Sequence, residues 1–416
     1  MLAGGGGRLL LDQQGVNKYL CPPSPSPALA CLSSCTASPV SDTGFLAASA
    51  TFRRIAAAKP ADQTARRLEC QADVEAGIRA YLGLGPSTEV MVTSSGTDGL
   101  LLAAVMLEPE GGGRPTTAIL PSPAETGSGV PMAAACRTFD GPGAGRAVLR
   151  TTGETICVPL RDRAGAARET GAVIEAFGTA SRNARGRAVL HLTHGTKTGL
   201  VAPAEVPNGV EVIVDACQLR LPPAAIRIYR GRGLPVVITG SRFLGGPAFS
   251  GAVLLPDGRF SATVRRRAEL ACAAPRRAAT TADSMWSGLG PLLRWTAALA
   301  DLDGAPRGEE EVDTMARRLE REAVAVVTAL PGTRVIGGGH RCFGIVTFAV
   351  EAVAGQPGGW QSAGELRPLY RALHDQGVLV GQPVDVGPFG CLRLAIGLRD
   401  VVRGSVEASL RRLADA

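Results

Sequence analysis

The feature that most constrains the fold is a series of short apolar runs that alternate with helix-like stretches between residues 89 and 256. Each run places apolar residues at consecutive positions, which is typical of strands buried on both faces of a parallel sheet. We predict strands at 89–93, 116–120, 155–160, 187–193, 211–215, 234–240 and 251–256. The sequence therefore predicts an α/β fold with a mostly parallel seven-stranded sheet flanked by helices.

The pattern changes on both sides of this series. Residues 1–50 are rich in Gly, Pro, Ser and Ala and predict an extended arm with turns, and a helix is expected over about 61–83. In the C-terminal part we expect strands at 342–350, 377–381 and 391–397, and helices near 283–302, 308–329, 363–376 and from about 399. We therefore divide the chain into an N-terminal arm (1–50), a large domain (51–275) and a small C-terminal α+β domain with linking helices (276–416).

Composition excludes several classes of protein. The chain has 416 residues and is 45% apolar, which is enough for a large buried core. No run approaches the roughly 18 apolar residues of a membrane helix. The N-terminal apolar stretch is too short for a secretory signal, so we expect a cytoplasmic protein with no membrane partner. Aromatic residues are only 4% and arginines are spread along the chain, so we expect no nucleic-acid partner despite a net charge of +7.

The ten cysteines lie in apolar stretches and include no C-x-x-C pair. A metal site or a disulfide framework usually shows such paired spacing. We therefore expect buried, unreactive thiols and no metal.

Three segments place polar residues at the ends of predicted strands. The first is Ser95-Gly96-Thr97, between a strand and a helix, where free backbone N–H groups and the helix dipole favour a phosphate. The same turn is also an ordinary helix N-cap. The second ends a strand on Asp215, with Gln218 three residues on. A carboxylate there sits where open α/β sheets bind ligands, or it caps the next helix.

The third segment is VVITGSRFLGGP, in which Thr239, Ser241 and Arg242 follow a strand. Hydroxyls beside a cation suit a phosphate, although a plain loop between two strands has the same composition. Asp215 follows Thr97 by 118 residues, and Arg242 follows Asp215 by 27. In combination the segments resemble the fold-type-I pyridoxal 5′-phosphate (PLP) proteins, and most of all the class V aminotransferase and cysteine desulfurase group. The resemblance covers roughly residues 60–400.

The resemblance implies a role for each residue of the site. Five residues would hold the phosphate of PLP or pyridoxamine 5′-phosphate (PMP), namely Ser95, Gly96, Thr97, Thr239 and Ser241. Asp215 would keep the pyridine nitrogen protonated, and Gln218 and Thr196 would lie near the phenolic oxygen. Arg393 would bind a substrate carboxylate, although a solvated arginine at a strand end is an equal alternative.

Two positions depart from the group. In PSPAETGSGVP, Glu125 is followed by Thr126, where the desulfurases carry a ring-stacking histidine, so Thr126 can cover the ring only by van der Waals contact. The chain also offers no obvious nucleophilic cysteine on a mobile loop, so we do not expect cysteine desulfuration. Arg242 occupies the place of the Schiff-base lysine. A guanidinium stays protonated and forms no ordinary Schiff base, so the standard mechanism is lost.

The sequence contains other side chains that can act as a base in place of the missing Schiff-base lysine. Lysines occur only at positions 18, 59 and 197, and Lys197 follows the ring-facing Thr196. Burial can shift an amine towards neutrality, so Lys197 or the neighbouring His194 can serve as a base in a catalytic set with Arg242. Lys197 can instead point into solvent or pair with a carboxylate.

Three interpretations follow. The chain is a binding or regulatory relative, it uses PMP or free PLP with another base, or the fold serves other chemistry. We favour a protein of amino-acid or specialised small-molecule metabolism that binds PLP or PMP noncovalently and acts on an amino or keto acid by transferase- or lyase-type chemistry. The alternative is a catalytically silent relative that binds a phosphate-bearing ligand or partners an active subunit. By resemblance we expect a homodimer whose arm, at residues 33–38, helps to close the site.

Overall fold

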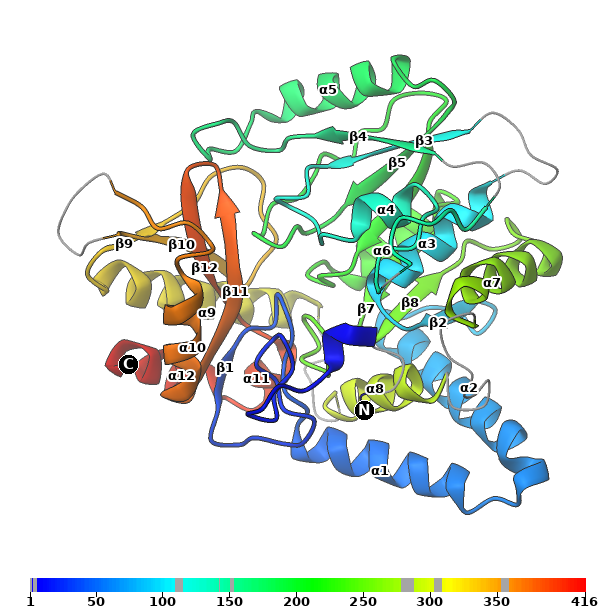
Figure 1. Ribbon diagram of the computed structural model, residues 1–416, viewed down its shortest axis with the longest axis horizontal. Helices are drawn as coiled ribbons and strands as arrows, with labels where there is room; N and C mark the ends of the chain where they lie inside the picture. Colours follow the sequence, from blue (N-terminus) through cyan, green and yellow to red (C-terminus); the bar gives the residue numbers. More distant parts are fainter. Residues whose placement is uncertain are drawn as a thin grey trace.

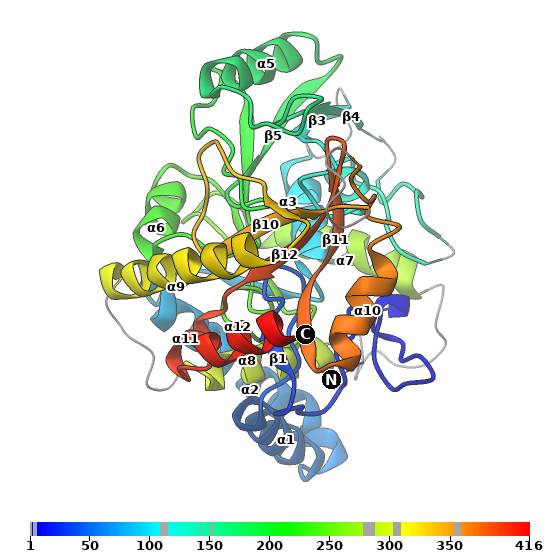
Figure 2. The ribbon, with the colours of Figure 1, turned by 90° about the vertical axis from the view of Figure 1, so that its left-hand side faces the viewer.

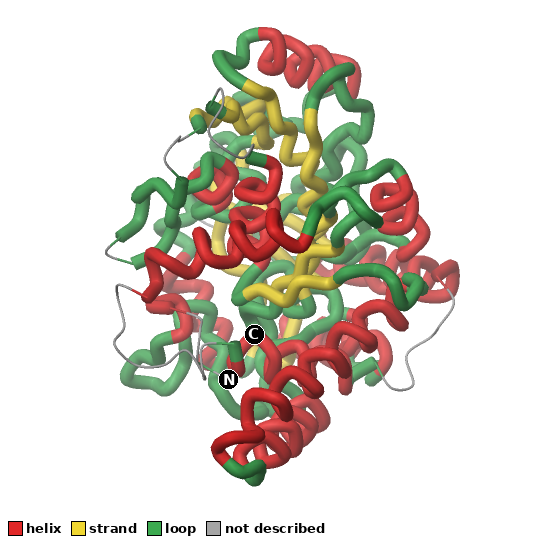
Figure 3. Tube along the Cα trace, turned by 90° about the vertical axis from the view of Figure 1, so that its right-hand side faces the viewer, coloured by secondary structure: helices red, strands yellow, loops and turns green. Residues whose placement is uncertain are grey.

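The computed structural model describes residue 2 and residues 6–108, 115–141, 143–149, 153–277, 288–302, 309–352 and 359–416. Over these residues the chain forms two sheets that lie side by side, each covered by helices (Figure 1). Strands run through the interior and helices lie around them (Figure 3).

The larger sheet contains all seven strands of the predicted series. They are β2 (Val90–Thr93), β3 (Thr116–Pro121), β4 (Glu154–Val158), β5 (Arg187–Thr193), β6 (Glu211–Ala216), β7 (Val236–Thr239) and β8 (Gly251–Leu254). Their order is β2-β8-β7-β6-β5-β3-β4, and β8 alone among them runs opposite to the other six. The prediction of a mostly parallel seven-stranded sheet is therefore confirmed.

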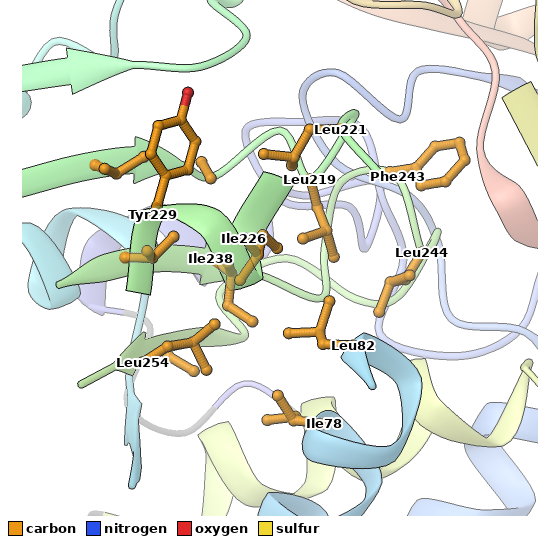
Figure 4. Packing of buried hydrophobic residues seen from close by; sticks show 14 of the residues in the cluster. Ile78, Leu82, Leu219, Leu221, Ile226, Tyr229, Ile238, Phe243, Leu244 and Leu254 are labelled. Carbon is orange, nitrogen blue, oxygen red and sulfur yellow. The ribbon is translucent and has the colours of Figure 1, made fainter. Parts of the chain in front are cut away.

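Helices cover both faces of this sheet. The helices on one face share an apolar cluster with it and are α1 (Asp42–Ala56), α2 (Gln63–Leu82), α5 (Thr170–Arg182), α6 (Pro223–Gly231) and α8 (Leu289–Ala300). Figure 4 shows Ile78 and Leu82 of α2 facing Ile238 of β7 within this cluster. The opposite face packs against α3 (Gly96–Leu107), α4 (Val130–Ala134) and α7 (Ala262–Arg277).

The smaller sheet has the order β1-β11-β12-β10-β9. Its strands are β1 (Ala30–Leu32), β9 (Thr333–Val335), β10 (Ile345–Val350), β11 (Val378–Val386) and β12 (Phe389–Ala395). The helices of this part are α9 (Glu309–Ala329), α10 (Arg367–Asp375), α11 (Leu398–Val402) and α12 (Val406–Asp415). Apolar residues of α9, α10 and α12 pack with the sheet. Figure 2 shows these three helices beside its strands. The expected α+β arrangement of the C-terminal part is present.

The N-terminal segment differs from the predicted extended arm in two places. Residues 42–56 form α1, which begins because the Ser41 hydroxyl accepts a hydrogen bond from the Gly44 N–H at 2.8 Å. Residues 30–32 form β1, which pairs in parallel with β11. The Gly, Pro, Ser and Ala residues of this stretch predict an extended arm. The structure depends instead on the Ser41 helix cap and on the pairing with β11. The helix expected over 61–83 is α2, preceded by the short helix η2 (Pro60–Asp62).

The helices expected near 283–302 and 308–329 correspond to α8 and α9, and residues 283–287 and 308 lie outside the described residues. The boundary between domains near residue 275 stays a proposal. Among the described residues, no helix combines the length and apolarity needed to cross a membrane. All ten cysteines are free thiols, and they are buried except for exposed Cys157 and the partly exposed Cys217 and Cys272.

Candidate functional site

The first turn of α3 begins at Ser95, which is the N-cap of the helix. Its hydroxyl accepts a hydrogen bond from the Asp98 N–H at 3.2 Å and lies 2.7 Å from the Asp98 carboxylate. The helix is apolar on all sides and buried, so it is held firmly against the sheet. Ser95 therefore acts as an ordinary cap, and the backbone N–H groups that open the helix lack partners within it.

Glycine at position 96 allows α3 to approach two other segments. A Cβ on Gly96 would lie 2.4 Å from Cys217 Sγ and 2.9 Å from Thr239 Cγ2. The Thr239 hydroxyl in turn donates to the Cys217 carbonyl at 2.7 Å. The predicted proximity of the turn at 95–97 to Thr239 is thus confirmed, and buried Ser241 follows two residues on.

Asp215 lies near the carboxyl end of β6, the central strand of the larger sheet, and only 6% of it is exposed. Its Oδ1 accepts a hydrogen bond from the Cys217 N–H at 3.1 Å. Burial raises the pKa of this carboxyl above its usual value, while the bonds from Cys217 and the charge of Arg242 oppose the rise. Asp215 therefore lies buried at the carboxyl edge of a central strand.

The turn after β6 orients Gln218. Leu219 has φ 52°, in the left-handed region that a bulky residue adopts only at a cost of roughly 1–3 kcal/mol. Its side chain packs in the apolar cluster, and so does that of Phe243, which follows Arg242 (Figure 4). The core therefore fixes the backbone on which Gln218 and Arg242 stand.

The N-terminal segment enters the site at Cys35. The Cys35 carbonyl accepts hydrogen bonds from Gln218 Nε2 at 3.1 Å and from Arg242 Nη1 at 2.8 Å. Burial lowers the pKa of Arg242, and the charge of Arg393 lowers it further. Arg242, which stands where the resemblance places the Schiff-base lysine, thus holds the segment 33–38 beside Gln218.

Three arginines bond to consecutive residues of this segment. Arg220 donates to the Ser34 hydroxyl at 2.7 Å, and Arg393 donates to the Thr36 hydroxyl at 3.0 Å. Arg242 holds Cys35 between them. The arm therefore lies at the site of its own chain. Sequence reasoning missed Arg220, whose only signal is a charge within the apolar stretch that follows Gln218.

Arg393 projects from β12, and 3% of it is exposed. Its Nε and Nη2 donate to the Gln382 carbonyl at 3.2 and 2.6 Å, and Nη1 donates to the Lys197 carbonyl at 2.8 Å. With the bond to Thr36, protein atoms occupy four of its five N–H groups. Arg393 therefore ties the arm, β11 and the loop after β5 together.

The loop after β5 is fixed by a buried ion pair. Arg161 Nε donates to the Glu125 carboxylate at 2.6 Å, and Arg161 Nη2 donates to the Thr198 hydroxyl at 3.0 Å. The Thr198 hydroxyl donates to the other Glu125 oxygen. Sequence reasoning missed Arg161 and Thr198, because nothing in their local pattern marks them as partners of Glu125.

This ion pair positions two predicted residues. Thr196 accepts a hydrogen bond from the Leu200 N–H at 3.0 Å, so its hydroxyl closes the loop. Thr126 is 4% exposed, and its hydroxyl has no hydrogen-bond partner among the described residues. The Lys197 N–H donates to the Glu125 carbonyl at 2.9 Å, which joins the two segments.

His194 lies apart from these residues. Leu190, Leu192 and Val214 point to the α6 face of the sheet, and alternation along the strands places His194 there and Asp215 on the α3 face. His194 Nδ1 lies 2.9 Å from the Tyr229 hydroxyl of α6, and burial lowers the His194 pKa to about 4. The structure does not bring the imidazole to Asp215.

Lys197 contacts this group of residues through both its side-chain amine and its backbone. Its Nζ donates to the Pro123 carbonyl at 2.9 Å, and its backbone carbonyl binds Arg393. Burial lowers the Lys197 pKa to about 8, and the charge of Arg393 adds to the effect, while Glu125 and Asp385 oppose it. A considerable fraction of this amine is neutral near physiological pH.

The neutral amine predicts a distinct pH dependence of labelling. Only the unprotonated amine acylates, so labelling of Lys197 should rise to its plateau through about pH 8. An amine with the ordinary lysine pKa of about 10.4 keeps rising to higher pH. Peptide mass spectrometry after a brief acetic anhydride pulse separates the three lysines of the chain. A Lys197 profile that still rises towards about pH 10.4 contradicts the prediction.

Comparisons by sequence found no match: no family model and no curated protein matches the chain. Solved structures do match. The cystine C–S lyase C-DES in complex with its product cysteine persulfide has a TM-score of 0.59 and 16% identity, over 93% of this chain and 97% of that one. A lysine-to-alanine mutant of C-DES, with glycine covalently linked to the PLP cofactor, has a TM-score of 0.58 and 15% identity, over 93% and 96%.

The cysteine desulfurase CsdA from Escherichia coli matches with a TM-score of 0.53 and 14% identity, over 93% of this chain and 95% of that one. At such identities the likeness is one of fold. The α/β fold of this chain, with a mixed sheet flanked by helices, is the fold-type-I fold of these proteins.

Proposed function

We propose that the protein binds PLP or PMP noncovalently and acts on an amino or keto acid, by transferase- or lyase-type chemistry and as a homodimer. The observation that carries the proposal is the meeting of Gly96, Thr239 and Asp215 at one edge of the sheet. Ligands of open α/β sheets bind at this edge. One of the matched structures contains a PLP cofactor and another contains a cysteine persulfide product, and these molecules belong to those proteins.

The donors and acceptors of the site fit the cofactor. Within the described residues no lysine or arginine lies in salt-bridge contact with buried Asp215, so a pyridinium N–H supplies a partner that the carboxylate lacks. The buried Gln218 Oε1 and Thr126 Oγ1 also have no partner among these residues, as expected of groups that face a polar ligand. The opening turn of α3 offers backbone N–H groups to a phosphate.

Individual residues of the chain have distinct roles in the proposed activity. The bound cofactor supplies an electron sink for bonds at the carbon that carries the amino group. Asp215 holds the proton of the ring nitrogen, and the arm excludes water through its bonds to Gln218 and Arg242. Arg242 stays charged and moves no proton. Lys197 Nζ, with a pKa of about 8, is the group suited to hold or release a proton.

One observation favours a second candidate function. Gln218 and Arg242 both donate to the Cys35 carbonyl, so two side chains expected beside the cofactor stabilise the arm. This arrangement suits a catalytically silent relative that binds a phosphate-bearing ligand at α3 or pairs with an active subunit.

Dialysis and borohydride separate these functions. The purified protein is incubated with PLP, followed by absorbance, and divided into a dialysed and a borohydride-reduced sample. We expect dialysis to remove the absorbance and reduction to leave the mass of the chain unchanged. A reduced adduct on Lys197 contradicts noncovalent binding. If PLP and PMP both fail to bind, the proposal fails and the silent relative is supported.

A further inference from the structure

Three cations gather where the arm meets the loop after β5. Arg242 and Arg393 bond to the consecutive residues Cys35 and Thr36, whose Cα atoms are about 3.8 Å apart as in any trans peptide. Arg393 also binds the Lys197 carbonyl at 2.8 Å. The charge of Arg393 lowers the pKa of both Arg242 and Lys197, so the three groups repel one another.

Ion pairs with carboxylates do not balance this charge, although the charge of Asp215 acts on Arg242 through space. Within the described residues neither Arg242 nor Arg393 forms an ion pair, and every bond given for them ends on a carbonyl or a hydroxyl. Glu125, the nearest buried acid to Lys197, is already paired with Arg161. Buried guanidinium groups normally have anionic partners, so this region has an excess of positive charge.

Among the described residues, Arg242 and Arg393 differ in how many of their N–H groups remain without a hydrogen bond to protein atoms. Arg393 has four of its five N–H groups bonded to protein atoms. Within the part of the chain that the structure describes, Arg242 forms one hydrogen bond, through Nη1 to Cys35, and its side chain is partly exposed. None of its nitrogens is a buried atom without a partner, so its remaining N–H groups face space that solvent reaches. Arg242 is therefore the arginine of this site whose guanidinium group has N–H donors available to a ligand.

We infer that Arg242 is a carboxylate subsite and that the ligand of this region is a short dicarboxylic acid. One carboxylate binds the free edge of Arg242, whose planar fork matches it. The other lies at Lys197 and the remaining N–H of Arg393. This inference rests on the proposed function only in that the cofactor binds at the same site. The carboxylate subsite itself consists of side chains that are present in the cofactor-free protein. It makes Arg242 the determinant that selects acidic amino or keto acids.

Calorimetric titration of the cofactor-free protein tests the subsite. The probes are succinate and butyrate, which have equal chain length and differ by one carboxylate. We expect succinate to bind at least about tenfold more tightly, a difference of about 1.4 kcal/mol. Arg242→Gln keeps a polar N–H donor and removes the charge, so it should reduce the preference to less than about threefold. Arg66→Gln, at an exposed ion pair of α2, is the matched control and should keep it.

Several outcomes overturn the inference. These are equal binding of succinate and butyrate, an unchanged preference in Arg242→Gln, or inorganic phosphate that binds as succinate does and is lost in the same variant. If Arg242→Gln does not fold, the salt dependence of the natural protein decides, because the preference must fall between 0.01 and 1 M ionic strength. Failure of the proposed function shows separately, as absent PLP binding by a protein that still prefers succinate.

Discussion

Replacing Arg242 by lysine is expected to turn a noncovalent cofactor complex into a covalent one. The position is partly buried beside Asp215, and burial already lowers the pKa of the arginine there. A lysine amine in the same surroundings loses its proton far more readily than a guanidinium and can then condense with the PLP aldehyde. The change is all-or-none, because the natural side chain cannot form this bond.

The measurement is borohydride reduction of Arg242→Lys with PLP, followed by peptide mass spectrometry. We expect the adduct on the peptide that contains residue 242 and no adduct in the natural protein. Arg232→Lys adds one lysine at an exposed position and is the matched control. A variant that binds PLP without a reducible adduct, or an adduct that also appears on Arg232→Lys, contradicts the expectation.

Replacing Asp215 is expected to weaken cofactor binding by about 10- to 100-fold. A charge-assisted hydrogen bond contributes roughly 1.5–3 kcal/mol, and a buried pyridinium without its carboxylate loses it. Asp215→Ala tests the size of the loss, and Asp215→Asn keeps the shape while removing the charge. PLP titration by absorbance measures both. Unchanged affinity in both variants contradicts the role.

The pH dependence of Asp215 has opposite signs for binding and stability. Burial raises its pKa in the free protein, so the folded state holds the proton more tightly than the unfolded chain does. Its contribution to stability is present below the unfolded pKa and is lost as pH rises through the folded pKa. A bound pyridinium favours the carboxylate, so affinity rises with pH over the same range. Asp215→Asn should abolish both trends in thermal melts and titrations.

The larger sheet could be predicted because its strands are continuous apolar runs, a local signal that tertiary contacts only reinforce. The approach of the 95–97 turn to Thr239 also followed, since parallel strands place their carboxyl ends at one edge. The side of the sheet for His194 could not be predicted in the same way, because it depends on the register in which Thr193 pairs with Asp215, and that register is set by the folded sheet.

Other features depend on partners far away in sequence. The bond between Cys35 and Arg242 joins residues 207 positions apart, and nothing in the sequence around either residue predicts its partner. Glu125 and Arg161 form their ion pair across 36 positions without any shared motif. The arrangement of the arm is therefore decided by packing, and composition alone described it as an extended segment.

The pairing of β1 with β11 has a consequence for synthesis of the chain. Residues 30–32 pair with residues 378–380, and Ser34 bonds to the Ala395 carbonyl 361 positions later. Loop closure over such distances is slow, and the strands that complete these contacts leave the ribosome long after residues 30–34. The larger sheet can form during translation, whereas the segment at Cys35 must wait for β12. A nascent protein shortened before residue 378 therefore has the sheet edge with Asp215 but lacks the contacts that place the arm over it.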